Sequence, residues 1–140
     1  MLTHVDHVQL AAPAGSEDAL RAYYVGVLGV TEVPKPPALA DRGGCWFAAG
    51  AVRLHLGIEE DFRAARKAHP GLGVRGIQAY ADRLAAHGAP VTWDDGLPGH
   101  HRFYSEDPAG NRLEFLEPAP PAQAVSGGAS RTRPTPCGGR

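Results

Sequence analysis

The sequence predicts an α+β fold in which one structural unit occurs twice. Three observations support this prediction. The stretch "VRLHLG" at residues 52–57 is echoed by "NRLEFL" at residues 111–116, a helical pattern precedes each stretch, and a short apolar strand pattern precedes each helix. Each half of the chain is therefore expected to contain a strand, a helix and then two or three strands.

The first half begins with the strand candidate "DHVQLAAP" at residues 6–13. The helix candidate "SEDALRAYYVGVLGV" follows, with Ser16 as its N-cap, apolar residues at helical spacing and an end at Gly29. The strands expected after this helix are "TEVPKP", "CWFAA" and "AVRLHLGI". We place this first module at about residues 1–60.

The second half begins with the strand candidate "AHPGLGVRG", and the helix candidate "IQAYADRLAAHGAPV" ends at Gly88. The strands expected next are "APVTWDD", "HRFYSED" and "NRLEFLE", and "DPAGN" supplies proline and glycine for a tight turn between the last two. We place this second module at about residues 66–117. Residues 118–140 are rich in proline, glycine, alanine and serine, a composition that predicts a flexible tail.

The size and charge of the chain limit its functions. A length of 140 residues suits one domain with its own core. The net charge of -1 gives no electrostatic reason to expect nucleic acid or a membrane as a partner. The two cysteines lie far apart, no apolar run is long enough for a membrane helix, and the N-terminus lacks the features of a signal peptide. We therefore expect a cytoplasmic protein.

Strand alternation places four polar residues on the face that points away from the helices. Successive strand side chains point to opposite sides, so the apolar neighbours of each residue pack on a helix and the residue itself does not. The four are His7, His55, His69 and Glu114. A single histidine on a strand is more often a surface or core residue than a ligand. Two histidines and a carboxylate that converge on one face, however, suit Zn, Ni, Mn or Fe(II).

Several stretches resemble the vicinal oxygen chelate superfamily, which includes glyoxalase I, fosfomycin-modifying thiol transferases, extradiol dioxygenases and bleomycin-binding resistance proteins. They are "VDHVQLAAP", "LRAYYVGVLGV", "VRLHLG", "GIQAYADRLAAHGAPV" and above all "HRFYSEDPAGNRLEFLEP". The resemblance implies a glyoxalase-like domain at residues 1–117, in which two paired βαβββ modules form a curved mixed sheet around a concave cleft.

The resemblance also implies one divalent transition metal in the cleft: Zn, Ni, Mn or Fe. Its ligands in this chain would be the first-strand His7, the fifth-strand His69 and the last-strand Glu114. The fourth-strand ligand of glyoxalase I, a glutamate there, falls on His55. Gln9 stands where the fosfomycin group has threonine, and we expect it to contact substrate.

A metal held in this way leaves positions open for a small substrate that chelates it through two neighbouring oxygens. We expect a lyase, isomerase, thiol transferase or dioxygenase, with Glu114 and Tyr104 as catalytic residues. Arg102 is expected to clamp an anion of the substrate, and Tyr104 to donate a hydrogen bond to it. The alternative is a metal-free antibiotic resistance protein of the bleomycin-binding type, which sequesters its drug.

We also expect a symmetric homodimer with composite sites. The linker at residues 57–68 is long enough to let the two modules of one chain separate, as in single-chain members that the sequence resembles. The two histidines of one first module would then meet His69 and Glu114 of the other chain. Pairing of the modules within one chain would give the same ligand set in a monomer.

Overall fold

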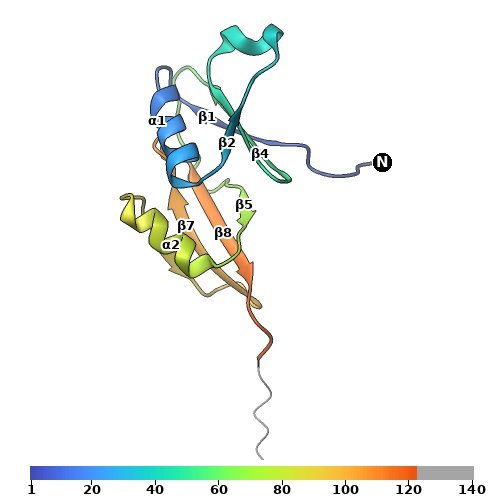
Figure 1. The fold of residues 1–140 in the computed structure, drawn as a ribbon, viewed down its shortest axis with the longest axis vertical. Helices are drawn as coiled ribbons and strands as arrows, with labels where there is room; N and C mark the ends of the chain where they lie inside the picture. Colours follow the sequence, from blue (N-terminus) through green and yellow to red (C-terminus); the bar gives the residue numbers. More distant parts are fainter. Residues whose placement is uncertain (123–140) are drawn as a thin grey trace, which may run out of the picture.

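The computed structural model describes residues 1–122 and contains the two expected modules (Figure 1). The first module contains β1 (Val8–Ala12), α1 (Glu17–Arg21), the π-helical segment η1 (Ala22–Val27), β2 (Thr31–Val33), the 3-10 helix η2 (Pro37–Arg42), β3 (Cys45–Ala49) and β4 (Val52–Ile58). The second module contains β5 (Gly71–Gly73), α2 (Ile77–Ala86), β6 (Thr92–Asp94), β7 (His100–Glu106) and β8 (Arg112–Pro118). The α+β class and the duplicated βαβββ unit are confirmed.

Each module forms its own four-stranded mixed sheet. The strand orders are β1-β4-β3-β2 and β5-β8-β7-β6, so the first strand of each module lies beside its last strand. That pair is parallel in both sheets, and the remaining pairs are antiparallel. The repeated order explains the echo in the sequence, because β4 and β8 are equivalent central strands.

Glycines end both helical segments, as predicted. Gly29 and Gly88 both have φ of 78°, a left-handed conformation that stops a helix and that glycine adopts without strain. Ser16 stands at the predicted N-cap position, but its hydroxyl donates to the Pro13 carbonyl oxygen at 2.6 Å and makes no capping hydrogen bond. Acidic residues in the first turn, Glu17 and Asp18, favour the start of α1 through the helix dipole instead.

One hydrophobic core spans both modules. Its fully buried large side chains come from both and include Tyr24, Phe47, Leu54, Leu84, Phe103 and Phe115. Figure 1 shows the two helices next to each other, and α2 donates hydrogen bonds across the contact, from Tyr80 Oη to Leu28 O at 2.9 Å and from Arg83 Nε to Val27 O at 2.7 Å. The helix-covered sides of both sheets therefore share the core, and the opposite sides are open.

The turn between β7 and β8 joins the modules at a second place. Asp107 Oδ1 accepts from the backbone N–H groups of Ala109 and Asn111 at 2.9 Å, which confirms the predicted tight turn. Asp107 Oδ2 accepts from Tyr24 Oη of the first module at 2.8 Å. Asn111 Nδ2 donates to Ala11 O of β1 at 2.8 Å. The "DPAGN" segment therefore ties β8 to the other module.

No helix among residues 1–122 is long and apolar enough to cross a membrane. The predicted flexible tail at residues 118–140 begins where β8 ends, at Pro118, and residues 123–140 lie outside the described part of the chain. The cytoplasmic location and the proposed module boundaries stay predictions.

Candidate metal and substrate site

His55 lies on the open side of the first sheet, inside a stack of three rings. Its imidazole is parallel to the Trp46 indole, with ring centroids 3.9 Å apart, and the His7 imidazole stacks on it at 4.1 Å. The strand register produces this arrangement, because Trp46 on β3 and Gln9 on β1 are the direct neighbours of His55 on β4. His7 immediately precedes β1.

The surroundings of His55 favour a neutral ring, and a contact with Asp6 orients the ring of His7. Burial lowers the pKa of His55, and the nearby His7 lowers it further. His7 Nδ1 lies 2.9 Å from Asp6 Oδ1, and this hydrogen bond in turn lowers the pKa of Asp6. Because an ionised carboxylate only accepts, Nδ1 of His7 carries the hydrogen and its Nε2 is left as a ligand atom.

Glu114 lies on the open side of the second sheet, 9% exposed, between His69 and Arg102. Its Oε2 is 2.9 Å from His69 Nε2, and its Oε1 accepts from Arg102 Nη1 at 3.2 Å. His69 precedes β5, and its Nδ1 lies 2.7 Å from the carbonyl oxygen of Lys67. A carbonyl can only accept, so this contact fixes the hydrogen on Nδ1 and aims Nε2 at Glu114.

The contact between His69 and Glu114 fits a divalent cation. With the hydrogen on Nδ1, the lone pairs of His69 Nε2 and Glu114 Oε2 face each other at 2.9 Å and repel unless a proton or a metal ion lies between them. A histidine that donates through one ring nitrogen to a protein oxygen and presents the other is the usual state of a metal ligand. His69 and His7 both have this orientation.

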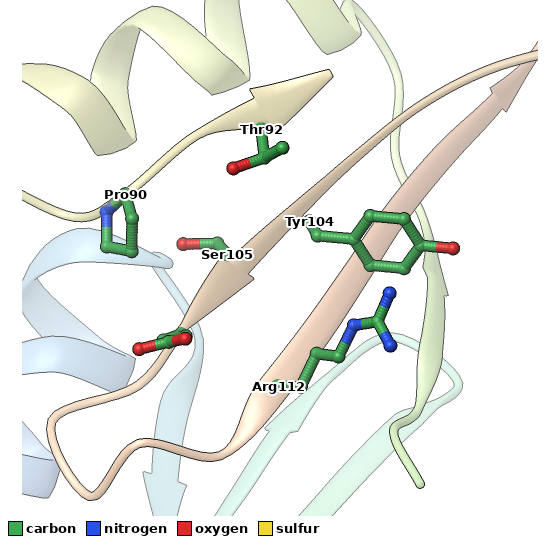
Figure 2. Close-up of a pocket in the computed structure, with 6 residues that line it drawn as sticks. Pro90, Thr92, Tyr104, Ser105 and Arg112 are labelled. Atoms are coloured by element: carbon green, nitrogen blue, oxygen red, sulfur yellow. The ribbon is translucent and has the colours of Figure 1, made fainter. Parts of the chain in front are cut away.

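Tyr104 and Arg112 complete the open side of the second sheet. Tyr104 on β7 is opposite Glu114 on β8, and its ring meets His69 edge-on at 5.5 Å between centroids. Figure 2 shows the Arg112 guanidinium beside the Tyr104 ring, and the two are 4.0 Å apart from Cζ to centroid. They line a cavity of about 250 Å³ together with Pro90, Thr92, Ser105 and Glu106.

Arg102 is held by two carboxylates. Its Nε and Nη2 lie 2.9 and 2.8 Å from Asp94 Oδ1 on the adjacent β6, and its Nη1 reaches Glu114. The hydrogen bond from Arg102 lowers the pKa of Asp94, which keeps that carboxylate charged. Arg102 was expected to bind an anion of the substrate, but most of its N–H donors therefore form hydrogen bonds within the protein.

The structure groups the predicted site residues by sheet. His7, Gln9 and His55 lie on the first sheet, and the second carries Arg102, Tyr104 and Glu114, with His69 just before β5. Among residues 1–122, no group of three or more His, Cys, Asp or Glu side chains is placed to hold one metal ion. In one chain the predicted metal ligands therefore lie in two separate groups, one at each sheet.

Sequence reasoning did not assign three residues to these faces: Trp46, Asp94 and Arg112. The alternation of strand side chains could have identified Asp94 and Arg112. Both lie on the same open face as the predicted residues Arg102 and Glu114. No signal in the sequence showed that Trp46 stacks on His55, because its role depends on the β3–β4 register.

Comparisons with known proteins agree with this architecture. Residues 8–116 match the family model described as a glyoxalase-like domain. A glyoxalase family protein from Bacillus anthracis is 43% identical, with a TM-score of 0.83 over 85% of this chain and 98% of that one. No protein with a curated description matches the sequence.

Two more distant structures share the fold. The fosfomycin resistance protein FosX from Listeria monocytogenes, complexed with Mn(II) and 1S,2S-dihydroxypropylphosphonic acid as a mutant, is 13% identical. Its TM-score is 0.70 over 85% of this chain and 95% of that one. An antibiotic binding protein from Streptomyces is 19% identical, with a TM-score of 0.66 over 84% of this chain and 98% of that one.

Proposed function

The chain belongs to the glyoxalase-like domain family, and from that premise we propose that it is a metal-dependent enzyme acting on a small substrate that chelates the metal through oxygens. The observation that carries the proposal is the 2.9 Å approach of His69 Nε2 to Glu114 Oε2, which brings two potential metal-ligand atoms together. The Mn(II) complex of FosX, which has the same fold, supports it.

A bound metal would supply a Lewis acid that stabilises negative charge on a substrate oxygen. Residues of the chain would hold the metal and orient the substrate. Arg102 binds Glu114 through Oε1 and leaves Oε2 for the metal, and the carbonyl of Lys67 fixes the ring of His69. Tyr104, next to His69, presents its hydroxyl as a hydrogen-bond donor to substrate.

Gln9 is the proposed substrate contact on the first sheet. It lies opposite His55 in the register, and its amide occupies the space next to the backbone of Gly57. A Cβ at position 57 would come within 2.6 Å of Gln9 Nε2, so the glycine makes room for this side chain.

We propose that two copies of the chain complete each site. Each copy has two half-sites on open sheet faces, and the N-terminal segment before β1 leads away from the sheets with Leu2 and Val5 exposed (Figure 1). In a symmetric homodimer, the stacked His7 and His55 of one copy would face the His69–Glu114 pair of the other. The assembled set of three imidazoles and one carboxylate suits Zn, Ni, Mn or Fe(II).

Metal content of protein purified without a polyhistidine tag tests the metal site. We expect wild type to bind one transition metal ion per chain, and His69→Ala and Glu114→Gln to lose nearly all of it. His87→Ala is the matched control, because His87 lies at the end of α2 and its ring forms a hydrogen bond with the helix carbonyl of Arg83. Full metal stoichiometry in both site variants contradicts the proposal.

A mixing experiment tests the composite site. His7→Ala and Glu114→Gln chains are each expected to bind no metal, whereas their mixed dimer regains one intact centre of its two. A monomer by light scattering, with no rescue on mixing, rules out a shared site. Catalysis is tested separately: removal of metal with EDTA should abolish turnover of a diol, hydroxyketone or epoxide, and added metal should restore it.

A second function is favoured by the ring stack of Trp46, His55 and His7. Parallel rings on an open face are a suitable surface for a flat aromatic drug. The antibiotic binding protein from Streptomyces shares the fold and supports this candidate. Tight binding of an unmodified aromatic antibiotic by metal-free protein, unaffected by Glu114→Gln, would favour sequestration over catalysis.

A further inference from the structure

Two arginines lie on the open face of the second sheet, and they have different partners. Arg102 is paired with Asp94 and Glu114. Arg112 on β8 forms no ion pair with any carboxylate among residues 1–122, although Glu106 lies opposite it in the β7–β8 register. A guanidinium cannot lose its charge at any physiological pH, so Arg112 is a permanent cation on this face with no anionic partner in the described part of the chain.

Tyr104 holds the Arg112 guanidinium in a defined orientation. The Cζ atom is 4.0 Å from the ring centroid, a distance at which the guanidinium stacks on the aromatic face. Stacking uses the flat side of the guanidinium and leaves its N–H donors at the edges, where a planar fork binds an oxyanion with two hydrogen bonds. The group is therefore positioned in advance, which lowers the entropy lost on binding.

Arg112 also lies between two cavities. One is the 250 Å³ cavity of Figure 2, and the other, of about 450 Å³, is lined by Gln9, His69 and Phe62 among others. The second cavity contains one of the proposed metal ligands and the proposed first-sheet substrate contact. An anion bound to Arg112 can therefore belong to the same ligand that reaches His69.

We infer that Arg112 binds the anionic group of the ligand, a carboxylate or a phosphoryl group. Arg112 and Glu114 are two residues apart on one face of β8, so their backbone positions lie roughly 7 Å apart and both side chains can contact one small ligand. The ligand class is then a small molecule with its oxyanion a few bonds from its chelating oxygens. The position of the metal rests on the proposed function, whereas the anion site itself does not. Arg102 acts in this arrangement as a positioning residue for Glu114.

Titration of the metal-free protein with inorganic phosphate tests the inference, with the arginine Nε–H resonances observed by NMR. The Arg112 resonance is expected to move with saturation, and the Arg102 resonance to move little, because its donors are engaged. Arg112→Gln should weaken phosphate binding roughly tenfold, the effect of one charge-assisted pair of hydrogen bonds. Glu106→Gln should strengthen it, because it removes the negative charge opposite Arg112.

Arg21→Gln is the matched control, because it removes an arginine that is paired with Glu32 and Asp18 on the first module. It should leave phosphate binding unchanged. Equal phosphate affinity in wild type and Arg112→Gln, or an Arg112 resonance that moves no more than that of Arg21, overturns the inference. Because the titration uses metal-free protein, it gives the same answer whether or not the chain proves to bind metal.

Discussion

Replacement of Asp107 by alanine should destabilise the whole domain, because this carboxylate joins the two modules. It is 5% exposed and accepts four hydrogen bonds. The donors are Tyr24 Oη at 2.8 Å and, at 2.9 Å, the backbone N–H groups of Ala109 and Asn111 and the Asn111 side-chain amide. Asp107→Ala leaves all four donors without this acceptor.

The expected loss follows from the burial of these donors. An unsatisfied buried donor costs about 1–3 kcal/mol. Tyr24 is 0% exposed and Asn111 6%, whereas Ala109 is half-buried and water can enter the space left by the carboxylate. We therefore expect a loss of about 3–4 kcal/mol in the free energy of unfolding, a large part of the roughly 5–15 kcal/mol of a typical domain.

Urea denaturation followed by circular dichroism measures this loss, with two variants for comparison. Tyr24→Phe removes one donor together with its bond and should cost about 1 kcal/mol. Asp82→Ala removes an exposed carboxylate of α2 with one hydrogen bond, to Gln78, and should change stability by less than about 0.5 kcal/mol. If Asp107→Ala costs no more than Tyr24→Phe, the carboxylate does not join the modules in the way described.

Two further predictions concern the first half-site. Gly57→Ala should lower the free energy of unfolding by less than about 1 kcal/mol, because the group within 2.6 Å of the new Cβ is the flexible end of Gln9. A larger loss in urea denaturation would show that Gln9 cannot move. The pKa of His55 in the folded protein is lowered from its ordinary value of 6.5. As the pH falls below 6.5, the ring is protonated in the unfolded chain before it is protonated in the folded protein, so the free energy of unfolding of the metal-free protein decreases. The melting temperatures of wild type and His55→Gln should therefore lie further apart at pH 7.5 than at pH 5.5, and a constant difference would contradict the lowered pKa.

The repeated phrase in the sequence was sufficient to predict the module and the face on which the site residues within the strands lie. Strand parity is a local property: it depends only on the alternation of side chains along the chain. It correctly separated Leu113 and Phe115, which are buried against the helices, from Glu114, which lies on the open face. Gly29 and Gly88 likewise ended their helices where the sequence placed the ends, because a left-handed residue interrupts the backbone hydrogen bonds locally.

Ser16 takes the predicted N-cap position, but its side chain does not cap the helix, for a physical reason. A serine hydroxyl before a helix can donate to an upstream carbonyl or accept from the first turn, and here the Pro13 carbonyl is the partner. The choice depends on the path of the chain between β1 and α1, which the type of residue does not fix.

Pairings between strands and between modules were decided by the tertiary structure alone. Asp94 forms an ion pair with Arg102 because β6 is next to β7, and Trp46 stacks on His55 because β3 is next to β4. Composition and periodicity contain no information on which distant side chains share a register. The sequence by itself determined which strand residues face the open side of each sheet, whereas the packing of one shared core determined that the predicted metal ligands of one chain lie in two separate groups.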